Sequence, residues 1–231
     1  MKIHRFISPA FNLDEKTLTI NDPEILNQWV NVLRFRVGEK VMLCDGTGAE
    51  SLATITQISK ESIEVEVLGK TSNQMQKKVN LYCAILKKEN FELVAQKTVE
   101  VGMNKIIPIT TDRTIKQNLR MDRLQKIVKE AAEQSGRSIV PEVNEIQNFF
   151  VAIELASKNA STYIFDLTAE AQFKKEKIPD EINIFIGPEG GFSEEEIDIA
   201  RRLGCKVVSL GDLVLRGETA AIVAVWAGVN L

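Results

Sequence analysis

The chain has 231 residues, 44% of them hydrophobic and 26% charged, a composition typical of a folded globular protein rather than a disordered or collagen-like one. A single histidine, His4, excludes a histidine-rich zinc site and argues against a Ser-His-Asp hydrolase. Cys44, Cys83 and Cys205 lie far apart and form no CxxC pair. We therefore predict reduced, buried thiols and no metal site.

The net charge of −3 is distributed unevenly. Residues 71–137 carry 13 basic and 7 acidic side chains, whereas residues 1–70 carry 8 and 10, and residues 138–231 carry 8 and 15. A basic middle segment is compatible with a local contact to nucleic acid, although a solvated helix surface produces the same pattern. The chain shows no signal-peptide run, and its apolar segment 220–231 is too short to span a bilayer, so we expect a cytoplasmic protein.

The first 70 residues are predicted to form a small β-barrel. Alternating apolar residues and turn sequences such as Asp45-Gly46-Thr47-Gly48 predict strands at residues 4–8, 17–20, 40–44, 49–58 and 62–68. One helix begins at Asp22-Pro23 and places on one face the side chains of Ile25, Leu26, Trp29, Val32 and Leu33. Several short strands with a single helix favour a compact barrel.

A polar segment, residues 71–78, is predicted to link this barrel to an α/β domain at residues 79–231. Strands are expected at residues 79–86, 105–109, 139–143, 162–165, 182–186 and 206–210, and helices at residues 88–101, 122–135, 193–204 and 221–229. The last helix is apolar on all sides, which predicts that it is buried. Strands that alternate with helices indicate a mainly parallel sheet.

The loop GPEGG, residues 187–191, follows a strand that ends at Ile186. Glycines at the carboxyl end of a parallel strand let the backbone approach a ligand closely, at the edge where open α/β sheets bind ligands. The sequence is neither a P-loop nor a GxGxxG dinucleotide fingerprint. A ligand site is therefore predicted, with a tight strand-to-helix turn as the simpler alternative.

A second loop, residues 210–220, leads into the last helix and carries Arg216 and Glu218. Charged side chains at the start of a buried helix need a partner or a ligand, although an Arg–Glu pair that caps the helix would also satisfy them. Glu189 and Glu218 come from neighbouring loops at one end of the predicted sheet. They are therefore the carboxylates best placed for acid–base chemistry.

Two groups of side chains are candidates for RNA contacts. Arg5, Arg34 and Arg36 accompany aromatic residues in the predicted barrel, and arginine with aromatic groups holds RNA by phosphate contacts and stacking. The aromatic residues themselves are expected to belong mainly to the core. Gln134 and Arg137 lie at the end of the helix 122–135, where capping and solvation explain them equally well.

Four segments carry a family resemblance: IGPEGGFSEEE, LGDLVLRGETA, IVKEAAEQSGR and QKTVEVG. Together they are similar to the RsmE-type 16S ribosomal RNA (uridine-N3) methyltransferases, which belong to the knotted SPOUT class of S-adenosylmethionine enzymes. The front of the chain, HRF and VLRFRVGEKVMLCDGTG, resembles the PUA-like RNA-binding barrel of that family. Two positions depart from the family pattern: no histidine stands at Gln28 to Asn31 before the VLR run, and Gly217 replaces a more frequent threonine.

The resemblance implies an α/β SPOUT domain with a deep trefoil knot, a homodimer, and methylation of N3 of uridine 1498 in the 16S RNA of the small ribosomal subunit. It also implies S-adenosylmethionine contacts from Leu167, Ile186, Gly187, Pro188, Glu189, Gly190, Gly191, Leu210, Gly211, Leu215 and Thr219. Methyl transfer from a sulfonium needs no metal, histidine or covalent cysteine, which agrees with the composition. We hypothesise that Arg216 stabilises the developing uridine anion, and that Glu218 orients Arg216 or accepts the N3 proton.

Two alternatives remain at this point. A non-catalytic RNA-binding or ribosome-assembly protein would keep the fold but would have no reason to keep both loops and a cofactor site, so calorimetry with S-adenosylmethionine distinguishes it. A SPOUT enzyme with another target, such as transfer RNA, would bind the cofactor and modify a different nucleotide.

Overall fold

The computed structural model describes residues 3–74, 77–115, 118–173 and 179–231. It separates into two compact units. The first unit comprises residues 1–74 and 132–140, and the second comprises residues 75–131 and 141–231. Residues 132–140, which were expected in the α/β domain, belong with the first unit. The segment predicted as a linker, residues 71–78, is divided between the two units, and its residues 75–76 lie outside the described residues. Within the described ranges, no helix is both long and apolar enough to cross a membrane.

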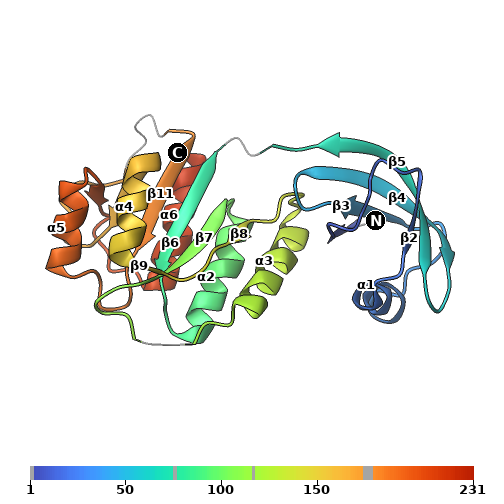
Figure 1. Cartoon of the computed structure of the whole chain (residues 1–231), viewed down its shortest axis with the longest axis horizontal. Helices are drawn as coiled ribbons and strands as arrows, with labels where there is room; N and C mark the ends of the chain where they lie inside the picture. Colours follow the sequence, from blue (N-terminus) through green and yellow to red (C-terminus); the bar gives the residue numbers. More distant parts are fainter. Residues whose placement is uncertain (1–2, 75–76, 116–117, 174–178) are drawn as a thin grey trace. The chain divides into compact units, whose positions relative to one another are not determined.

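The first unit is built on a five-stranded sheet with the order β1-β3-β4-β5-β2 (Figure 1). Its elements are β1 (His4–Ile7), β2 (Thr17–Ile20), α1 (Pro23–Asn27), the π-helix η1 (Gln28–Val32), β3 (Lys40–Cys44), β4 (Ala49–Ile58) and β5 (Ile63–Ser72). β1 runs parallel to β3, and the other pairs are antiparallel. β5 continues past the predicted end at residue 68 because it keeps pairing with β4 as far as Ser72, which lies opposite Ala49.

The helical segment of the first unit departs from the predicted face at one position. Asp22 caps α1 as expected, but residues 28–32 continue as a π-helix. A π-turn bonds each residue to the fifth one before it, which rotates the following side chains relative to an α-helix. Val32 is therefore 66% exposed, whereas Trp29 is fully buried, with its ring 4.7 Å from that of Phe6.

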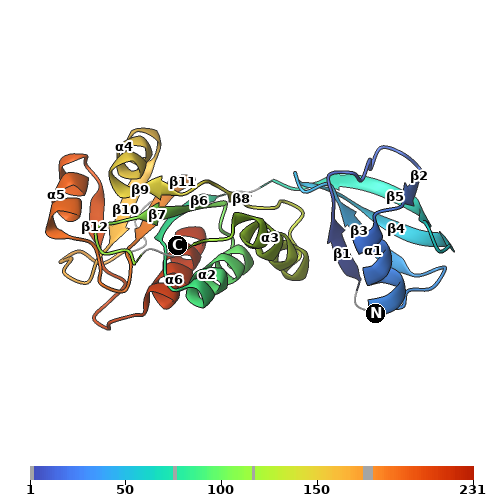
Figure 2. The same cartoon turned by 60° about the horizontal axis from the view of Figure 1, so that its bottom comes forward.

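The second unit is an α/β layer structure around a parallel sheet with the order β12-β10-β11-β6-β7-β8, in which β9 also pairs with β7. Its elements are β6 (Lys78–Ala84), α2 (Lys88–Glu100), β7 (Lys105–Thr110), α3 (Met121–Ser135), β8 (Glu142–Val143), β9 (Gln147–Asn148), α4 (Phe149–Asn159), β10 (Ser161–Phe165), β11 (Glu181–Ile186), α5 (Glu194–Arg202), β12 (Lys206–Val208) and α6 (Gly217–Asn230). Figure 2 shows α4 on one side of this sheet and α2 and α6 on the other. The predicted parallel α/β domain is confirmed.

Burial on both faces explains why the central strands read as continuous apolar runs. In β11, Phe185 packs under α4, with its ring 6.0 Å from that of Phe149. Ile182 and Ile184 point to the other face, where they meet Gly228 of α6. Because both faces are covered by helices, the edge at the carboxyl ends of the strands is left for a ligand.

For the second unit, two predictions need correction and two elements were not predicted. The strand expected at residues 139–143 is divided: only residues 142–143 join this sheet as β8, whereas Ile139 bridges to Gly46 and Thr47 in the first unit. The two elements that were not predicted are α4 and β9. The prediction that the last helix is buried on all sides is wrong for one face, because Trp226 is 51% exposed and Val223 is 37% exposed. The trefoil knot stays a prediction.

Candidate active site

A cavity of about 1100 Å³ lies at the carboxyl ends of three adjacent strands, β12, β10 and β11. Each strand delivers one loop to its wall: residues 166–168 follow β10, residues 187–193 follow β11, and residues 210–216 follow β12. Ligands of open α/β sheets bind at this edge. The two loops that the sequence singled out therefore meet in one cavity.

Most of the side chains and glycines predicted to contact the cofactor line this cavity. They are Leu167, Ile186, Gly187, Pro188, Glu189, Gly190, Gly191, Leu210 and Leu215. Arg216 and Glu218 line it as well. Gly211 and Thr219 are not part of the lining, and Thr219 is exposed on the first turn of α6. The cofactor contacts of individual residues stay predictions.

The GPEGG loop is a compact turn whose glycines are needed for two reasons. The N–H of Gly191 donates to the carbonyl of Pro188 at 2.8 Å, and Gly191 has a φ of +69°, in the region that favours glycine. A Cβ at Gly187 would lie 3.2 Å from the ring of Phe192, which is buried beneath the loop. The backbone therefore forms this part of the cavity wall.

A capping box fixes the helix that follows this loop. The Ser193 hydroxyl accepts the N–H of Glu196 at 3.3 Å, and the Glu196 carboxylate accepts the N–H of Ser193 at 2.8 Å. The Glu196 carboxylate also accepts the N–H of Asp112 at 3.0 Å. Burial raises the pKa of Glu196 despite these hydrogen bonds. The start of α5 is thus tied to the loop after β7.

Arg216 and Glu218 lie at the start of α6. Arg216 is the N-cap residue, but its side chain makes no capping hydrogen bond. Glu218 is in the first turn, where a carboxylate is favoured by the helix dipole. Among the residues that the structure describes, no ion pair joins the two side chains. The alternative in which they only cap the helix as a pair is therefore not what the structure shows.

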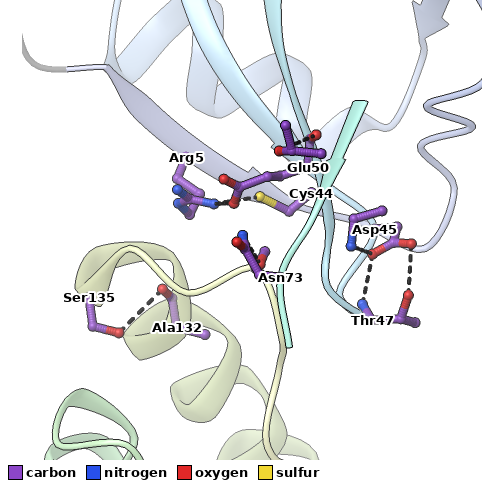
Figure 3. Close-up of polar contacts among 11 residues, drawn as sticks. Arg5, Cys44, Asp45, Thr47, Glu50, Asn73, Ala132 and Ser135 are labelled. Carbon is purple, nitrogen blue, oxygen red and sulfur yellow. Dashed lines mark hydrogen bonds and ion pairs between the residues drawn. The ribbon is translucent and has the colours of Figure 1, made fainter. Parts of the chain in front are cut away.

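All five residues predicted to contact RNA belong to the first unit. On β1, Arg5 is half-buried and forms an ion pair with Glu50; it also donates to the sulfur of Cys44 at 3.0 Å (Figure 3). Arg34 and Arg36 are exposed, and neither forms an ion pair in the described ranges. Arg34 and Arg36 therefore offer more uncompensated positive charge than Arg5 does.

The end of α3 packs against the strands of the first unit. Glu133 accepts the N–H of Ile7 in β1 at 2.8 Å, and the hydroxyl of Ser135 donates back to the carbonyl of Ala132 at 3.3 Å (Figure 3). Gln134 is exposed, whereas Arg137 is half-buried. Burial lowers the pKa of Arg137 to about 10, so this guanidinium is charged at neutral pH.

The three cysteines are free and buried, as predicted. Burial raises the pKa of Cys44 and of Cys205 to about 11 and raises that of Cys83 as well. Thiols of this kind are poor nucleophiles at neutral pH. In the part of the chain that the structure describes, no cluster of three or more His, Cys, Asp or Glu side chains is arranged to hold a metal ion.

Several lining residues were missed by the sequence analysis: Lys87, Asn90, Arg113, Asp166, Thr168, Asp198 and Arg201. The rule that identified the GPEGG loop also applies to part of this set, because Asp166 and Arg113 come shortly after strands β10 and β7. Asp198 and Arg201 lie within α5, and no signal in the sequence directs them to the cavity.

The chain is similar to RNA methyltransferases over nearly its whole length. Residues 73–227 match a family model described as an RNA methyltransferase domain, and residues 30–68 match an RNA methyltransferase PUA domain. A ribosomal RNA small subunit methyltransferase E from Synechocystis sp. is 30% identical over 230 residues, which cover 96% of this chain and 75% of that protein. One from Rickettsia conorii is 31% identical over 199 residues, covering 84% and 82%.

A solved structure agrees with these relatives. The crystal structure of a ribosomal RNA small subunit methyltransferase E from Neisseria gonorrhoeae, bound to S-adenosylmethionine, matches with a TM-score of 0.89 and 32% identity. The match covers 97% of this chain and 95% of that chain. The predicted PUA-like unit and SPOUT methyltransferase domain are thereby confirmed.

The cavity residues fit S-adenosylmethionine. The volume of about 1100 Å³ accommodates a ligand of this size. Leu210 and Leu215 supply apolar surface, and Gly187, Gly190 and Gly191 line the cavity without side chains of their own. The predicted cofactor is confirmed by the relatives. This chain belongs to the ribosomal RNA small subunit methyltransferase E family, whose members are S-adenosylmethionine-dependent RNA methyltransferases.

Proposed function

We propose that this enzyme methylates N3 of a uridine in the 16S RNA of the small ribosomal subunit, uridine 1498 by family resemblance. One observation carries the proposal: Arg216 and Glu218 line the same cavity as the GPEGG loop and form no ion pair with each other. The names of the relatives, which specify the small subunit RNA, support the choice of substrate. Such a substrate places the enzyme in the cytoplasm.

The chemistry of uridine sets what the site must do. N3 lies on the Watson–Crick edge and carries a proton at neutral pH, so the base must be unpaired or flipped out and must lose that proton. S-adenosylmethionine, when bound, supplies an electrophilic methyl group on sulfur. Backbone groups of the GPEGG loop orient the cofactor, and Leu210 and Leu215 exclude water from its surroundings.

Two side chains handle the charge that develops on the base. Arg216 donates hydrogen bonds to O2 or O4 of the uridine, where negative charge accumulates as N3 loses its proton. Glu218 orients Arg216 or accepts the N3 proton. With N3 deprotonated, the cofactor held by the GPEGG loop, Leu210 and Leu215 would supply the methyl group.

The first unit supplies the RNA contacts in this proposal. Arg34 and Arg36 are exposed and carry no ion pair among the described residues, so they are available to phosphates. Gln134 and Arg137 belong to the same unit, and Arg5 contributes less because Glu50 already neutralises its charge. RNA held by these residues would lose counterions, so binding depends on salt.

A homodimer is part of the proposal because α6 leaves an apolar face uncovered in the single chain. Val223 and Trp226 are exposed on α6, and Leu213 and Val214 are 78% and 79% exposed in the preceding loop. Adjacent exposed apolar side chains of this size mark interaction sites in soluble proteins. A second copy of the chain is the occupant that the family resemblance implies.

The deciding experiment maps methyl groups on 16S RNA by mass spectrometry. RNA from a strain that lacks the gene is compared with RNA from the same strain carrying the wild-type gene or the Arg216→Ala variant. We expect one N3-methyluridine that disappears in the deletion strain and returns only with the wild-type gene. A methyl group lost from another position or from transfer RNA would overturn the assigned substrate.

A further inference from the structure

Three hydrogen bonds join the GPEGG loop and the start of α5 to the loop that follows β7. Arg113 donates from Nη1 to the carbonyl of Gly190 at 2.7 Å. The Ser193 hydroxyl donates to Asp112 at 2.7 Å, and the N–H of Asp112 donates to Glu196 at 3.0 Å. β6 lies between β7 and β11 in the sheet, so this contact reaches across the end of a whole strand.

The aliphatic stem of Arg113, like its guanidinium head group, contacts Gly190. A Cβ built on Gly190 would lie 3.4 Å from Cδ and 3.5 Å from Cβ of Arg113. The aliphatic stem therefore covers Gly190 at van der Waals distance, and Arg113 is one of the residues that line the cavity. A packed stem reduces the conformational entropy that the side chain loses when its head group binds a ligand.

The guanidinium of Arg113 keeps most of its binding capacity. It has five N–H donors, of which the Gly190 carbonyl uses one. No carboxylate pairs with Arg113 among the described residues. By contrast, Arg201, another cation of the lining, donates to Asp198 at 3.4 Å. Arg113 therefore places a positive charge at the cavity that no protein carboxylate neutralises among the described residues.

The positive charge of Arg113 matters because several other residues that line the cavity are acidic. Carboxylates of Asp166, Glu189, Glu194 and Glu218 line the same cavity, and they repel the phosphates of an RNA substrate. A nucleotide whose base enters the cavity brings its own phosphates to the rim. An uncompensated arginine there lowers the electrostatic cost of that approach.

We propose that Arg113 binds a backbone phosphate of the RNA beside the target nucleotide while one of its N–H groups holds the Gly190 carbonyl. The inference rests on the proposed function only in taking RNA as the substrate. It adds to that function a phosphate contact in the second unit, on a residue that also supports the cofactor loop. Binding of RNA and of cofactor would then share one side chain.

The test separates charge from loop support with three substitutions. Arg113→Lys keeps the charge, Arg113→Gln keeps a neutral donor for the Gly190 carbonyl, and Arg113→Ala removes both. Arg202→Ala is the matched control, because Arg202 is an exposed arginine of α5 outside the cavity lining. Each full-length variant is titrated with an unmodified 16S RNA transcript at several salt concentrations, and with S-adenosylmethionine by calorimetry.

We expect Arg113→Ala and Arg113→Gln to weaken RNA binding about tenfold and to reduce the slope of log K against log salt by about 0.7 to 0.9. Arg113→Lys and Arg202→Ala should keep the wild-type slope. Arg113→Gln should bind S-adenosylmethionine as the wild type does, whereas Arg113→Ala should bind it more weakly.

An unchanged salt slope in Arg113→Ala would overturn the inference and leave Arg113 as a support for the loop only. The same follows if Arg202→Ala lowers the slope equally, since the effect would then be non-specific. Failure of the proposed function looks different: the wild-type enzyme would bind the transcript with a normal slope but would not methylate a 16S uridine.

Discussion

The backbone N–H of Phe35 donates to the carbonyl of Trp29 at 2.9 Å, across six residues. This bond closes the π-helical segment in the manner of a Schellman motif, which requires a left-handed residue just before the donor. That residue is Arg34, with a φ of +57°, and it is the one described non-glycine residue with positive φ. An exposed arginine thus occupies a position that glycine fits better.

Arg34→Gly should raise the free energy of unfolding by about 1 kcal/mol, because glycine adopts the left-handed conformation without the steric cost that an L-side chain carries. The same change should weaken binding of 16S RNA. Arg36→Gly is the control, since Arg36 has no positive φ and the substitution only adds flexibility to the unfolded chain. Urea unfolding and RNA titration check both variants, and equal stabilities would contradict the strain argument.

Arg216→Ala should lower the single-turnover methylation rate about 10²- to 10³-fold, the loss seen when one donor to a developing anion is removed. Glu218→Gln should lower the rate by a similar factor or more if this carboxylate accepts the proton. Both variants should bind S-adenosylmethionine normally in calorimetry. Near wild-type rates with intact cofactor binding would refute the assigned roles.

Gly228→Ala should destabilise the second unit by about 1 to 3 kcal/mol through overpacking. A Cβ at this position would lie 2.9 Å from Ile182 and 3.2 Å from Ile184, both buried in β11. Helix propensity alone predicts the opposite sign, a gain of about 1 kcal/mol for alanine. The direction in which the midpoint of unfolding in guanidinium chloride shifts therefore decides between the two effects.

Trp226→Glu should convert the enzyme to a monomer, because it places a charge in the apolar face of α6 that we assign to the dimer. Val151→Glu is the matched control: Val151 is 55% exposed on α4, which lies on the other side of the sheet. Light scattering with size-exclusion chromatography measures the mass. A dimer that survives Trp226→Glu would show that the subunits associate elsewhere.

The native enzyme should react slowly with thiol reagents at pH 8. With pKa values of about 11 for Cys44 and Cys205, about one thiol in a thousand is ionised at that pH. Reactivity should rise as the pH approaches 11, and all three cysteines should react at once in denaturant. Fast labelling of one thiol in the folded protein at pH 8 would contradict the burial described above.

Local patterns predicted most strands of both units, since alternation and turn residues lie within each segment. The errors arise where the conformation of a segment depends on more than the local pattern of apolar and turn residues. Ile139 joins the first unit through bridges to Gly46 and Thr47, which lie more than 90 residues earlier in the chain, and no local pattern reveals this pairing. Val32 does not lie on the predicted buried face of the helix, because residues 28–32 form a π-helix that rotates its side chain into solvent.

In the candidate site, too, local features were predicted and contacts between distant segments were not. Two of the three loops that follow β10, β11 and β12 were predicted from their own segments, because each follows its strand directly and carries glycines or charges. Arg113 was missed because its contact with Gly190 depends on the order of β7, β6 and β11 in the sheet. The order of strands is a property of the folded chain and is not written in any one segment.

The discontinuity of the first unit has a consequence for synthesis on the ribosome. Val140 donates to the carbonyl of Gly46 at 3.0 Å, and Asn73 donates to Ser138 at 3.0 Å. The early strands therefore emerge long before the segment that completes their hydrogen bonds, because residues 75–131 of the second unit must be synthesised first. A fragment that ends at residue 74 would lack these hydrogen bonds, so the first unit completes its hydrogen bonding only after residues 132–140 have been synthesised.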